Sequence, residues 1–503
     1  MGQYWASTVL EQARYPRLAG ELEVDVAVIG AGIVGLTTAL LLTQAGKSVA
    51  ILEARRIGQG ATAKSTAKVT SQHGLVYRKL IGDFGADGAM AYATANEAAI
   101  RRIEALVRDG AIDCSFETRP AYVYSCSPDE IADLRAEVEA AVGLGLPASF
   151  VTEAPLPFPI AGAMRFDRQA QFNPARYLQG LAAALGPTSR IFEDTRVVDI
   201  ENGDVCTAHT DGGAAVTARA VIVATHMPTV MQSLLFAKAF PLSHPMAAAS
   251  IDPSRAPSGM FISTGRPSHS FRVDSSGGAS VLVAAGGAYT PGETEDEREA
   301  ARDLDRFLAV NFGVEQVEHR WTNEDFMSID GMPFVGRVGA GHLYGATGFS
   351  AWGITNGTVA GMLLSDLVLG LSNPWAELFD PRRVKAAAGG PAFVKETLKV
   401  VGHFVGDRLL KRRPHAIDLA PGEAAIVELE GKQLAVYRQE NGTLQAVSAI
   451  CTHLGCVVGW NATDRSWDCP CHGSRFAIDG TVISGPATAP LDRLTLDEPA
   501  GGA

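Results

Sequence analysis

The sequence contains no apolar run long enough to cross a membrane. Its first 23 residues mix Glu11, Arg14, Arg17 and Glu21 with Pro16, and they include neither an apolar core nor a twin arginine, so no export signal is visible. Acidic residues outnumber basic ones by 55 to 43, and the net charge of −12 argues against nucleic acid and anionic membrane surfaces as partners. These features predict a cytoplasmic protein that does not span a membrane.

Cysteine is scarce, with seven in 503 residues, and it is unevenly placed. Cys114, Cys126 and Cys206 are scattered, which predicts buried thiols. The other four lie within about twenty residues near the end of the chain. The length predicts two to four domains, and the 47% hydrophobic and 19% charged residues are typical of soluble globular proteins.

The four clustered cysteines belong to two short motifs that also carry histidine. Cys451-x-His453 and Cys469-x-x-His472 each offer one thiolate and one imidazole. This donor set suits a [2Fe–2S] centre with two Cys ligands on one iron and two His ligands on the other. A structural zinc site is the alternative, but zinc sites usually show different spacings, such as C-x₂₋₄-C paired with C-x₂-C.

These two motifs closely resemble the Rieske iron–sulfur domain, in the disulfide-bearing version of quinol-oxidising cytochrome complexes. The resemblance implies that Cys451, His453, Cys469 and His472 bind the cluster. It also implies a disulfide between the two remaining cysteines, Cys456 and Cys471. In high-potential relatives a serine and a tyrosine follow the last histidine. Ser474 is present here but Phe476 replaces the tyrosine, which predicts a lower midpoint potential.

A βαβ unit is predicted near the start of the chain. The apolar segment 25–30 reads as a buried strand, residues 36–44 as a helix, and 49–53 as a second strand that ends in Glu53. Between them lies a Gly30-x-Gly32-x-x-Gly35 motif. Its glycines permit a tight turn, close approach of a pyrophosphate and close helix packing, while Glu53 can accept ribose hydroxyls. This unit predicts a dinucleotide site without deciding between FAD and NAD.

The acid-free segment 58–73 follows this unit and is rich in small and hydroxyl side chains. It resembles the segment that covers the flavin in the D-amino-acid oxidase/glycine oxidase superfamily; an ordinary surface loop is the alternative. Segments 169–178, 321–336 and 343–357 resemble later signatures of the same superfamily. In relatives, the helix N-terminus in the last segment points at the flavin pyrimidine edge, where a positive dipole end stabilises negative charge.

The motif and the resemblance together predict one set of FAD-binding residues. The set is Gly30, Gly32, Ile33, Val34, Gly35, Glu53, Ala54, Arg55, Gly60, Ala61, Thr62, Thr66, Ala67, Lys68, Val69, Val197, Ala224, Thr225, Gly348, Gly353, Ile354 and Thr355.

The fold class expected from these resemblances is α/β plus all-β: a Rossmann-like FAD-binding domain with an antiparallel-sheet substrate domain, followed by a small all-β Rieske domain. The oxidoreductase is expected over 1–385, a linker helix over 386–415 and the Rieske domain over 416–503. The FAD-binding parts are expected at about 20–75, 165–240 and 320–370, and the substrate-domain parts at about 76–164 and 241–319.

Three residues are weak catalytic candidates. His73 follows the flavin loop, where some relatives attach flavin covalently, but it also fits a buried structural histidine. His226 ends a predicted strand and is either a site residue or structural. Arg272 lies in a predicted substrate-domain strand, where it either binds a carboxylate or is a solvated charge. The sequence identifies no catalytic base.

The combination predicts an FAD-dependent dehydrogenase of an amine or amino acid. Electrons would leave the flavin singly through the cluster to an external one-electron acceptor. Two other hypotheses remain: an electron transferase fed by NAD(P)H, which the lack of a second dinucleotide motif disfavours, and a redox sensor without turnover. A Rieske oxygenase is disfavoured because no mononuclear iron domain follows the Rieske segment.

The basic run 411–413 predicts a helix-terminal charge cluster or, alternatively, a contact with a membrane or acidic partner.

Overall fold

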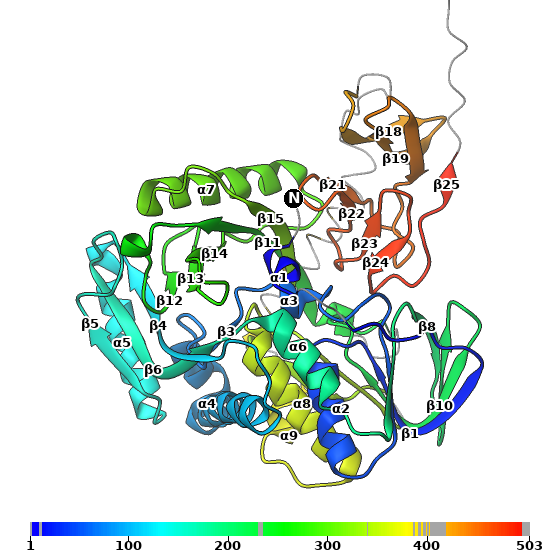
Figure 1. Cartoon of the computed structure of the whole chain (residues 1–503), viewed down its shortest axis with the longest axis horizontal. Helices are drawn as coiled ribbons and strands as arrows, with labels where there is room; N and C mark the ends of the chain where they lie inside the picture. Colours follow the sequence, from blue (N-terminus) through cyan, green and yellow to red (C-terminus); the bar gives the residue numbers. More distant parts are fainter. Residues whose placement is uncertain are drawn as a thin grey trace, which may run out of the picture.

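A computed structural model of the chain describes residues 3–9, 13–229, 235–339, 341–385, 388–390, 394–395, 399, 402 and 419–494 (Figure 1). Among these residues, no helix is both long and apolar enough to cross a bilayer. The basic run 411–413 and nearly all of the predicted linker helix lie outside the described residues.

The first sheet forms the centre of the predicted FAD-binding part. Its main path has the order β16-β17-β10-β1-β2-β7, in which β17, β10, β1, β2 and β7 run parallel, and β9 and β8 extend it from β10. The C-terminal half of β1 is buried, as expected of a strand covered on both faces. These strands are β1 (Glu21–Ile29), β2 (Val49–Leu52), β7 (Ser189–Phe192), β8 (Val197–Glu201), β9 (Cys206–Thr210), β10 (Ala215–Val223), β16 (Phe334–Arg337) and β17 (Leu343–Thr347).

Helices α2 and α8 pack side by side next to this sheet (Figure 1). Glycines allow their close approach, because a Cβ on Gly357 or Gly361 of α8 would lie only 2.7 to 2.8 Å from side-chain atoms of Ile33 or Thr37. The helices are α1 (Tyr4–Ser7), α2 (Ile33–Gln44), α3 (Ala61–Lys64), α4 (Tyr77–Asp109), α5 (Ile131–Gly143), α6 (Pro174–Ala183), α7 (Thr294–Phe312), α8 (Gly353–Leu369) and α9 (Ala376–Phe379), with 3₁₀ turns η1 (Pro128–Glu130), η3 (Leu235–Ala237) and η4 (Pro253–Arg255).

A second, larger sheet forms the predicted substrate domain. Its order is β15-β11-β14-β13-β12-β4-β6-β3, with β5 beside β6. All its pairs are antiparallel except β4 with β12, which run parallel. The strands are β3 (Lys68–Val69), β4 (Glu117–Ser125), β5 (Ala148–Val151), β6 (Gly162–Gln171), β11 (Ala239–Ser250), β12 (Met260–Ser263), β13 (Ser270–Asp274), β14 (Val281–Ala285) and β15 (His319–Ser328).

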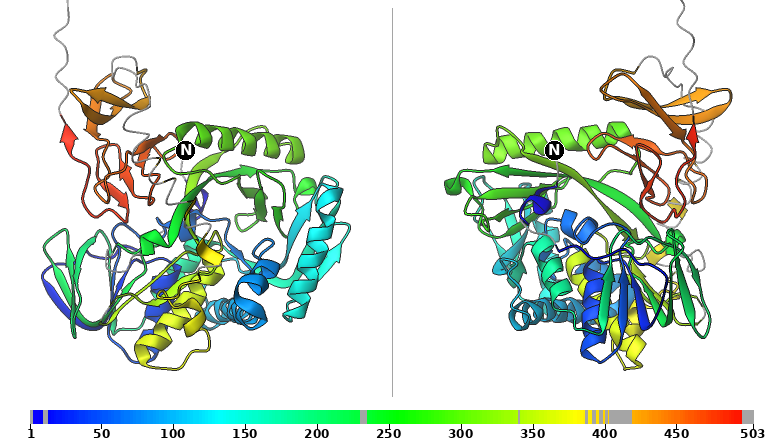
Figure 2. Two further views of the ribbon diagram at one scale, coloured as in Figure 1. Left: turned by 180° about the vertical axis from the view of Figure 1, so that it is seen from behind. Right: turned by 45° about the vertical axis from the view of Figure 1, so that its right-hand side comes forward.

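The C-terminal domain consists of two four-stranded antiparallel sheets and sits against the first two sheets near α7 and β15 (Figures 1 and 2). One sheet has the order β18-β19-β20-β25, the other β21-β22-β23-β24. The strands are β18 (Ala424–Leu429), β19 (Lys432–Arg438), β20 (Leu444–Ser448), β21 (Gly459–Asn461), β22 (Ser466–Asp468), β23 (Arg475–Ala477), β24 (Val482–Ser484) and β25 (Arg493–Leu494). The predicted fold class is therefore confirmed.

Four local predictions need correction. The first helix begins at Ile33, three residues earlier than predicted, because the glycine motif itself forms its start. From the sequence alone, residues 191–200 read as one strand, but they belong to two, β7 and β8, with Asp194 between them at a φ of 49°. Residues 116–124 read as a pair of strands, but they belong to one strand, β4, whose partners come from elsewhere in the chain. Cys126 is exposed, whereas Cys114 and Cys206 are buried as predicted.

Candidate functional site

A backbone cradle lies at the carboxyl end of β1, where the chain turns into α2. Gly30 has a φ of +101°, and a Cβ there would lie 2.6 Å from the carbonyl oxygen of Ala224. Gly35 is equally constrained, since its Cβ would lie 2.0 Å from the carbonyl oxygen of Gly30. The N-cap of α2 is Gly32, without a capping side chain. The exposed backbone amides and the positive dipole end fit a pyrophosphate.

Glu53 follows β2 and is held in place by the backbone. Its Oε2 accepts the N–H of Ala31 at 2.9 Å and its Oε1 accepts the N–H of Arg55 at 3.0 Å. Both bonds fix the carboxylate beside the glycine turn and along the same cavity. This position fits a ribose whose hydroxyls donate to a carboxylate.

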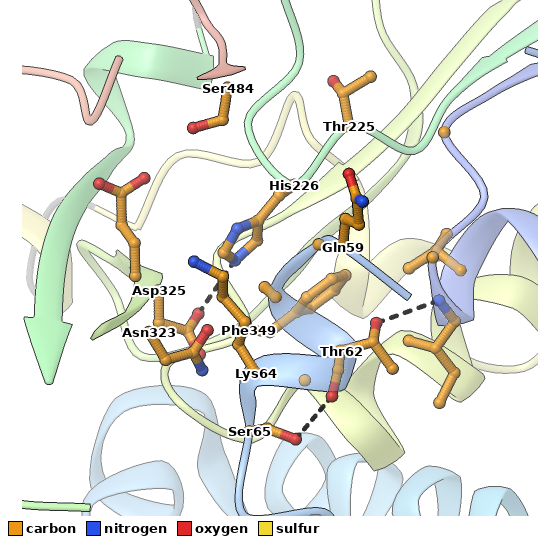
Figure 3. A pocket seen from close by; sticks show the side chains of 18 of the residues that line it. Gln59, Thr62, Lys64, Ser65, Thr225, His226, Asn323, Asp325, Phe349 and Ser484 are labelled. Carbon is orange, nitrogen blue, oxygen red and sulfur yellow. Dashed lines mark hydrogen bonds and ion pairs between the residues drawn. The ribbon is translucent and has the colours of Figure 1, made fainter. Parts of the chain in front are cut away.

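The segment from Gln59 to Lys68, which we call the cofactor loop, lies across the cavity and is held by other parts of the chain (Figure 3). Trp321 Nε1 donates to the carbonyl of Lys64 at 2.7 Å, and Trp5 Nε1 donates to that of Ser65 at 2.9 Å. Thr62 Oγ1 accepts the N–H of Ile33, the first residue of α2, at 3.2 Å. The loop is therefore part of the cofactor cavity and not a free surface loop.

All but three of the predicted FAD-binding residues line this one cavity. The exceptions are Gly35, Val69 and Gly348. Gly35 serves helix packing, Val69 is buried in β3, and Gly348 has a φ of +76° with Ser328 close to the place of its missing side chain. The cradle, the ribose acid and the loop thus fit an extended dinucleotide of the size of FAD.

The three catalytic candidates have different surroundings. His73 does not line the cavity: its Nδ1 contacts the hydroxyl of Tyr92 at 2.6 Å, its Nε2 lies 2.8 Å from the carbonyl of Thr70, and its ring stacks on Trp352. Burial lowers the pKa of His73 to about 3, so the ring is neutral. It is therefore a hydrogen-bonded core histidine, as the structural alternative predicts.

Arg272 also lies outside the cavity lining. It is 1% exposed, and its guanidinium donates to the carbonyls of Thr66 and Phe172 and lies over the ring of Trp5. It is neither a solvated charge nor a free carboxylate-binding group. Instead, it holds the back of the cofactor loop.

His226 does line the cavity (Figure 3). It follows β10 at a φ of 70°, and its Nε2 lies 3.4 Å from Oδ1 of Asp325. Its ring meets Phe326 edge-on at 4.8 Å between centroids. Of the three candidates, His226 alone is placed to touch a bound molecule.

Lys68 is a buried lysine at the substrate-sheet side of the cavity. Its Nζ donates to the carbonyl of Phe261 and, at 2.6 Å, to Oγ of Ser270. Among the described residues, no carboxylate pairs with it. Burial and the nearby charge of Arg272 hold the pKa of Lys68 well below its usual value. An anionic group of a bound molecule would complete this site.

The predicted cluster ligands lie together at the tip of the C-terminal domain. The rings of His453 and His472 are 5.0 Å apart between centroids, and Cys451 and Cys469 are buried as free thiols close enough to share a hydrogen bond. Nδ1 of His453 is buried and has no hydrogen-bond partner. Burial lowers the pKa of each histidine to about 4, which leaves neutral imidazoles. This donor set fits a [2Fe–2S] centre.

The other two cysteines form the expected disulfide, Cys456–Cys471. Hydrogen bonds from Cys469, from the backbone N–H groups of His453 and Leu454, and from Ser474 lower the pKa of Cys451 to about 7, although burial opposes this. The pKa of Cys469 is raised, first because of its hydrogen bond with Cys451. The surroundings therefore favour a thiolate at Cys451, the form that binds iron.

The histidine edge of this site faces the rest of the protein. The ring of Phe236, in η3, meets His453 and His472 edge-on at 5.5 and 5.4 Å between centroids. Next to His472, a Cβ on Gly473 would lie 2.9 Å from the ring of Phe326. Phe236 and Phe326 belong to one apolar cluster, and Phe326 touches His226 in the cavity wall.

The sequence did not predict that the C-terminal domain lines the cavity. Arg475, Ile483, Ser484 and Gly485 stand in the same wall as the glycine turn and Glu53. Asn323, Glu324 and Asp325 of β15 were also missed. For Asn323, Glu324 and Asp325, the only local signal was a polar run inside an otherwise alternating strand. No local sequence pattern marks the Rieske-domain residues that line the cavity.

Two protein families match different parts of the chain. Residues 25–367 match the family described as FAD dependent oxidoreductase, and residues 413–495 match the Rieske [2Fe-2S] domain. The chain is 33% identical over 497 residues to the Rieske 2Fe-2S iron-sulfur protein YhfW of Bacillus subtilis (strain 168), covering 98% of this chain and 97% of that protein. It is also 37% identical over 119 residues to the cytochrome b6-f complex iron-sulfur subunit 1 of a Synechocystis species, covering 23% of this chain and 61% of that subunit.

Solved structures with the same fold cover the first three quarters of the chain. Glycine oxidase from Geobacillus kaustophilus has a TM-score of 0.61 at 18% identity and covers 72% of this chain and 100% of its own. L-proline dehydrogenase from P. horikoshii has a TM-score of 0.59 at 18% identity, with 73% and 98% covered. L-amino acid deaminase from Proteus vulgaris has a TM-score of 0.61 at 16% identity, with 74% and 100% covered. At these identities the likeness establishes the fold alone.

Proposed function

Because the chain belongs to the FAD-dependent oxidoreductase family and carries a C-terminal Rieske [2Fe–2S] domain, we propose that it is a dehydrogenase of an amine or amino acid. Its electrons leave one at a time through the cluster to an external acceptor. FAD supplies two-electron chemistry at a carbon, and the cluster supplies single-electron transfer.

The observation that carries this proposal is the shared wall of the two sites. Ser484 (Figure 3) and Arg475 of the Rieske domain line the same cavity as the glycine turn and Glu53. The ligand histidines contact Phe236, which belongs to the oxidoreductase part. Contact between the domain that carries the cluster ligands and the cofactor cavity favours internal electron transfer over reaction of the flavin with a diffusing oxidant.

The charges along the cavity favour an amino acid over a simple amine. Lys68, which has no described carboxylate partner, is placed to hold a carboxylate by a charge-assisted hydrogen bond. On β15, Oδ1 of Asn323 is buried without a partner, and Asp325 also lines the cavity. These oxygens are acceptors for an amine. Together they offer opposite partners for the two ends of an amino acid. The L-proline and L-amino acid enzymes named above support this substrate class as structural relatives.

Anaerobic titration of the purified holoprotein tests the function. A panel of amino acids and amines is added while flavin absorbance at about 450 nm and the cluster's electron paramagnetic resonance signal are recorded. We expect at least one amino acid to bleach the flavin and then to produce the reduced-cluster signal. Bleaching without any cluster signal would refute internal transfer, and reduction by NADH alone would favour the electron transferase hypothesis. A panel that leaves the flavin oxidised would favour the redox sensor.

A further inference from the structure

We propose that the Rieske domain contributes to FAD affinity. FAD binding and docking of this domain onto the oxidoreductase part stabilise each other through an ion cluster of Lys64, Asp464 and Arg475. This inference rests on the proposed function only in taking FAD as the ligand. It concerns binding and docking, which are measured without any substrate.

The ion cluster joins the cofactor loop to the Rieske domain. Nζ of Lys64, at the end of α3 in that loop, lies 2.9 Å from Oδ2 of Asp464. Nη2 of Arg475 lies 2.9 Å from the same oxygen. Both carboxylate oxygens of Asp464 also accept from Thr322 of β15, from its N–H at 3.0 Å and its hydroxyl at 2.9 Å. One carboxylate thus connects the cofactor loop, the substrate sheet and the cluster domain.

These charges are removed from solvent, so their pairing matters. The side chains of Lys64, Asp464 and Arg475 are 18%, 14% and 7% exposed. Burial alone would raise the pKa of Asp464, but Lys64 and Arg475 outweigh burial and lower it. A buried pair contributes little when intact, yet loss of one partner leaves an uncompensated charge. Undocking would expose Asp464 and Arg475 to solvent but leave Lys64 without its acidic partner in the lining of the cofactor cavity.

A second set of contacts reaches the far side of the cavity. A Cβ on Gly485 would lie 2.8 Å from Cγ2 of Thr229, so the backbone of this loop touches the segment after β10. Nη2 of Arg196, which lines the cavity, donates to the carbonyl of Val482 at 2.8 Å. The Rieske domain therefore contacts the cavity wall on two sides, through the cofactor loop and beside the strand that carries Val197.

Linkage follows from this geometry. Contacts of FAD with the cofactor loop would further stabilise the conformation in which Lys64 meets Asp464. By reciprocity, a docked Rieske domain favours the loop conformation that binds FAD and raises FAD affinity by the same factor. An FAD-free chain should then hold its Rieske domain more weakly.

Two variants of the full-length protein test the coupling. Asp464→Asn keeps the size of the side chain but removes its charge and replaces one of its two acceptor oxygens by a donating amide. Asp479→Asn is the matched control, because Asp479 belongs to the same domain and pairs with Arg493 at the surface, away from the cavity. After flavin removal, the dissociation constant of added FAD is measured by quenching of flavin fluorescence. We expect about a 10-fold weaker FAD affinity for Asp464→Asn, within the usual range of coupling between sites, and no change for Asp479→Asn.

Docking is measured separately by hydrogen exchange in the unmodified protein. The backbone N–H groups of Ala462 and Thr463 donate to Glu297 of α7, across the interface, at 3.1 and 3.0 Å. We expect their exchange to be at least about 10-fold faster in the FAD-free chain. The visible spectrum of the cluster shows that the domain is folded in each sample. If Asp464→Asn loses its cluster, Lys64→Met tests the same link from the other side.

Equal FAD affinity in both Asp variants, or equal exchange at 462–463 with and without FAD, would overturn the coupling. Either result leaves the proposed function standing. Conversely, a failed substrate screen would end the proposed function without touching these binding measurements.

Discussion

Replacement of Lys68 by methionine separates the charge of this residue from its packing. Methionine fills similar space without a cation, so Ser270 and the carbonyl of Phe261 keep a neighbour of comparable volume. Lys68 is 8% exposed and, among the described residues, has no acidic partner. In the substrate-free protein its burial therefore costs stability, and in the amino-acid complex it should gain a carboxylate.

Removal of Lys68 should therefore affect the substrate-free protein and the amino-acid complex differently: the first loses the cost of burying an amine, and the second loses a partner for the substrate carboxylate. A hydrogen bond to a charged group contributes about 1.5 to 3 kcal/mol, which corresponds to about a 10- to 150-fold loss of affinity when the cation is removed. Lys68→Met should thus raise the KM, or the half-saturating concentration for anaerobic flavin bleaching, by that factor for an amino acid. The matching amine without a carboxylate should be unaffected. The unfolding temperature of the substrate-free variant should change little, because the cost of burying an amine without an acidic partner is removed while Ser270 and the carbonyl of Phe261 lose their donor.

The assay compares each amino acid that bleaches the flavin with its decarboxylated amine, in the parent protein and two variants. Lys238→Met is the matched control, because Lys238 also donates to backbone carbonyls, those of Pro381 and Arg383, but does not line the cavity. Equal losses for the amino acid and the amine, or no loss for either, would refute the assignment of Lys68 to a substrate carboxylate.

Three further predictions concern stability. The pKa of His73 is about 3 in the folded protein and about 6.5 in the unfolded chain, so below pH 6.5 the unfolded chain binds a proton that the native state lacks. Between pH 6.5 and 4.5, His73→Gln should therefore lose about 2 kcal/mol less stability than the parent in urea unfolding. Cys456→Ser opens a disulfide loop with a separation of 15 residues and should destabilise the Rieske domain by about 3 kcal/mol in thermal unfolding, against no effect for exposed Cys126→Ser. Arg272→Met should destabilise the protein by about 3 kcal/mol or more and weaken FAD binding, because the carbonyls of Thr66 and Phe172 lose their donor. The substrate KM of the FAD-saturated protein should stay unchanged, and a selective rise in that KM would restore Arg272 as a substrate ligand.

The sequence predicted the sites whose geometry is local. A glycine turn between a strand and a helix, with an acid at the end of the next strand, fixes the local backbone conformation. The spacing of these residues therefore indicates the cavity-lining positions from Gly30 to Glu53. The two Cys and His motifs lie on two loops of one small domain, and the structure brings them together as expected. In each case the residues share a short stretch of chain.

The roles of the catalytic candidates were harder to predict, because they depend on where each side chain points in the folded protein. Arg272 lies on a strand of the expected sheet, but its side chain points to the back of the cofactor loop and not to the cavity. His73 follows that loop, but it turns into the core against Tyr92 and Trp352. The side chain of a residue in a strand points to one of the two faces of the sheet, and only the packed structure shows which face meets the ligand.

Arg475 shows why the contribution of the Rieske domain was not visible in the sequence. On either side of it, Ser474 and Phe476 face the cluster loops and the domain core, so alternation along β23 directs Arg475 outward. In an isolated Rieske domain an outward arginine is expected to be solvated. Here it is 6% exposed, and it bonds Asp464 and Asp468 of its own domain. Thr322 of β15, in the oxidoreductase part, adds an acceptor at 3.4 Å. The burial of Arg475 thus depends both on acids within the Rieske domain and on its contact with β15, and the internal electron transfer proposed above requires that contact.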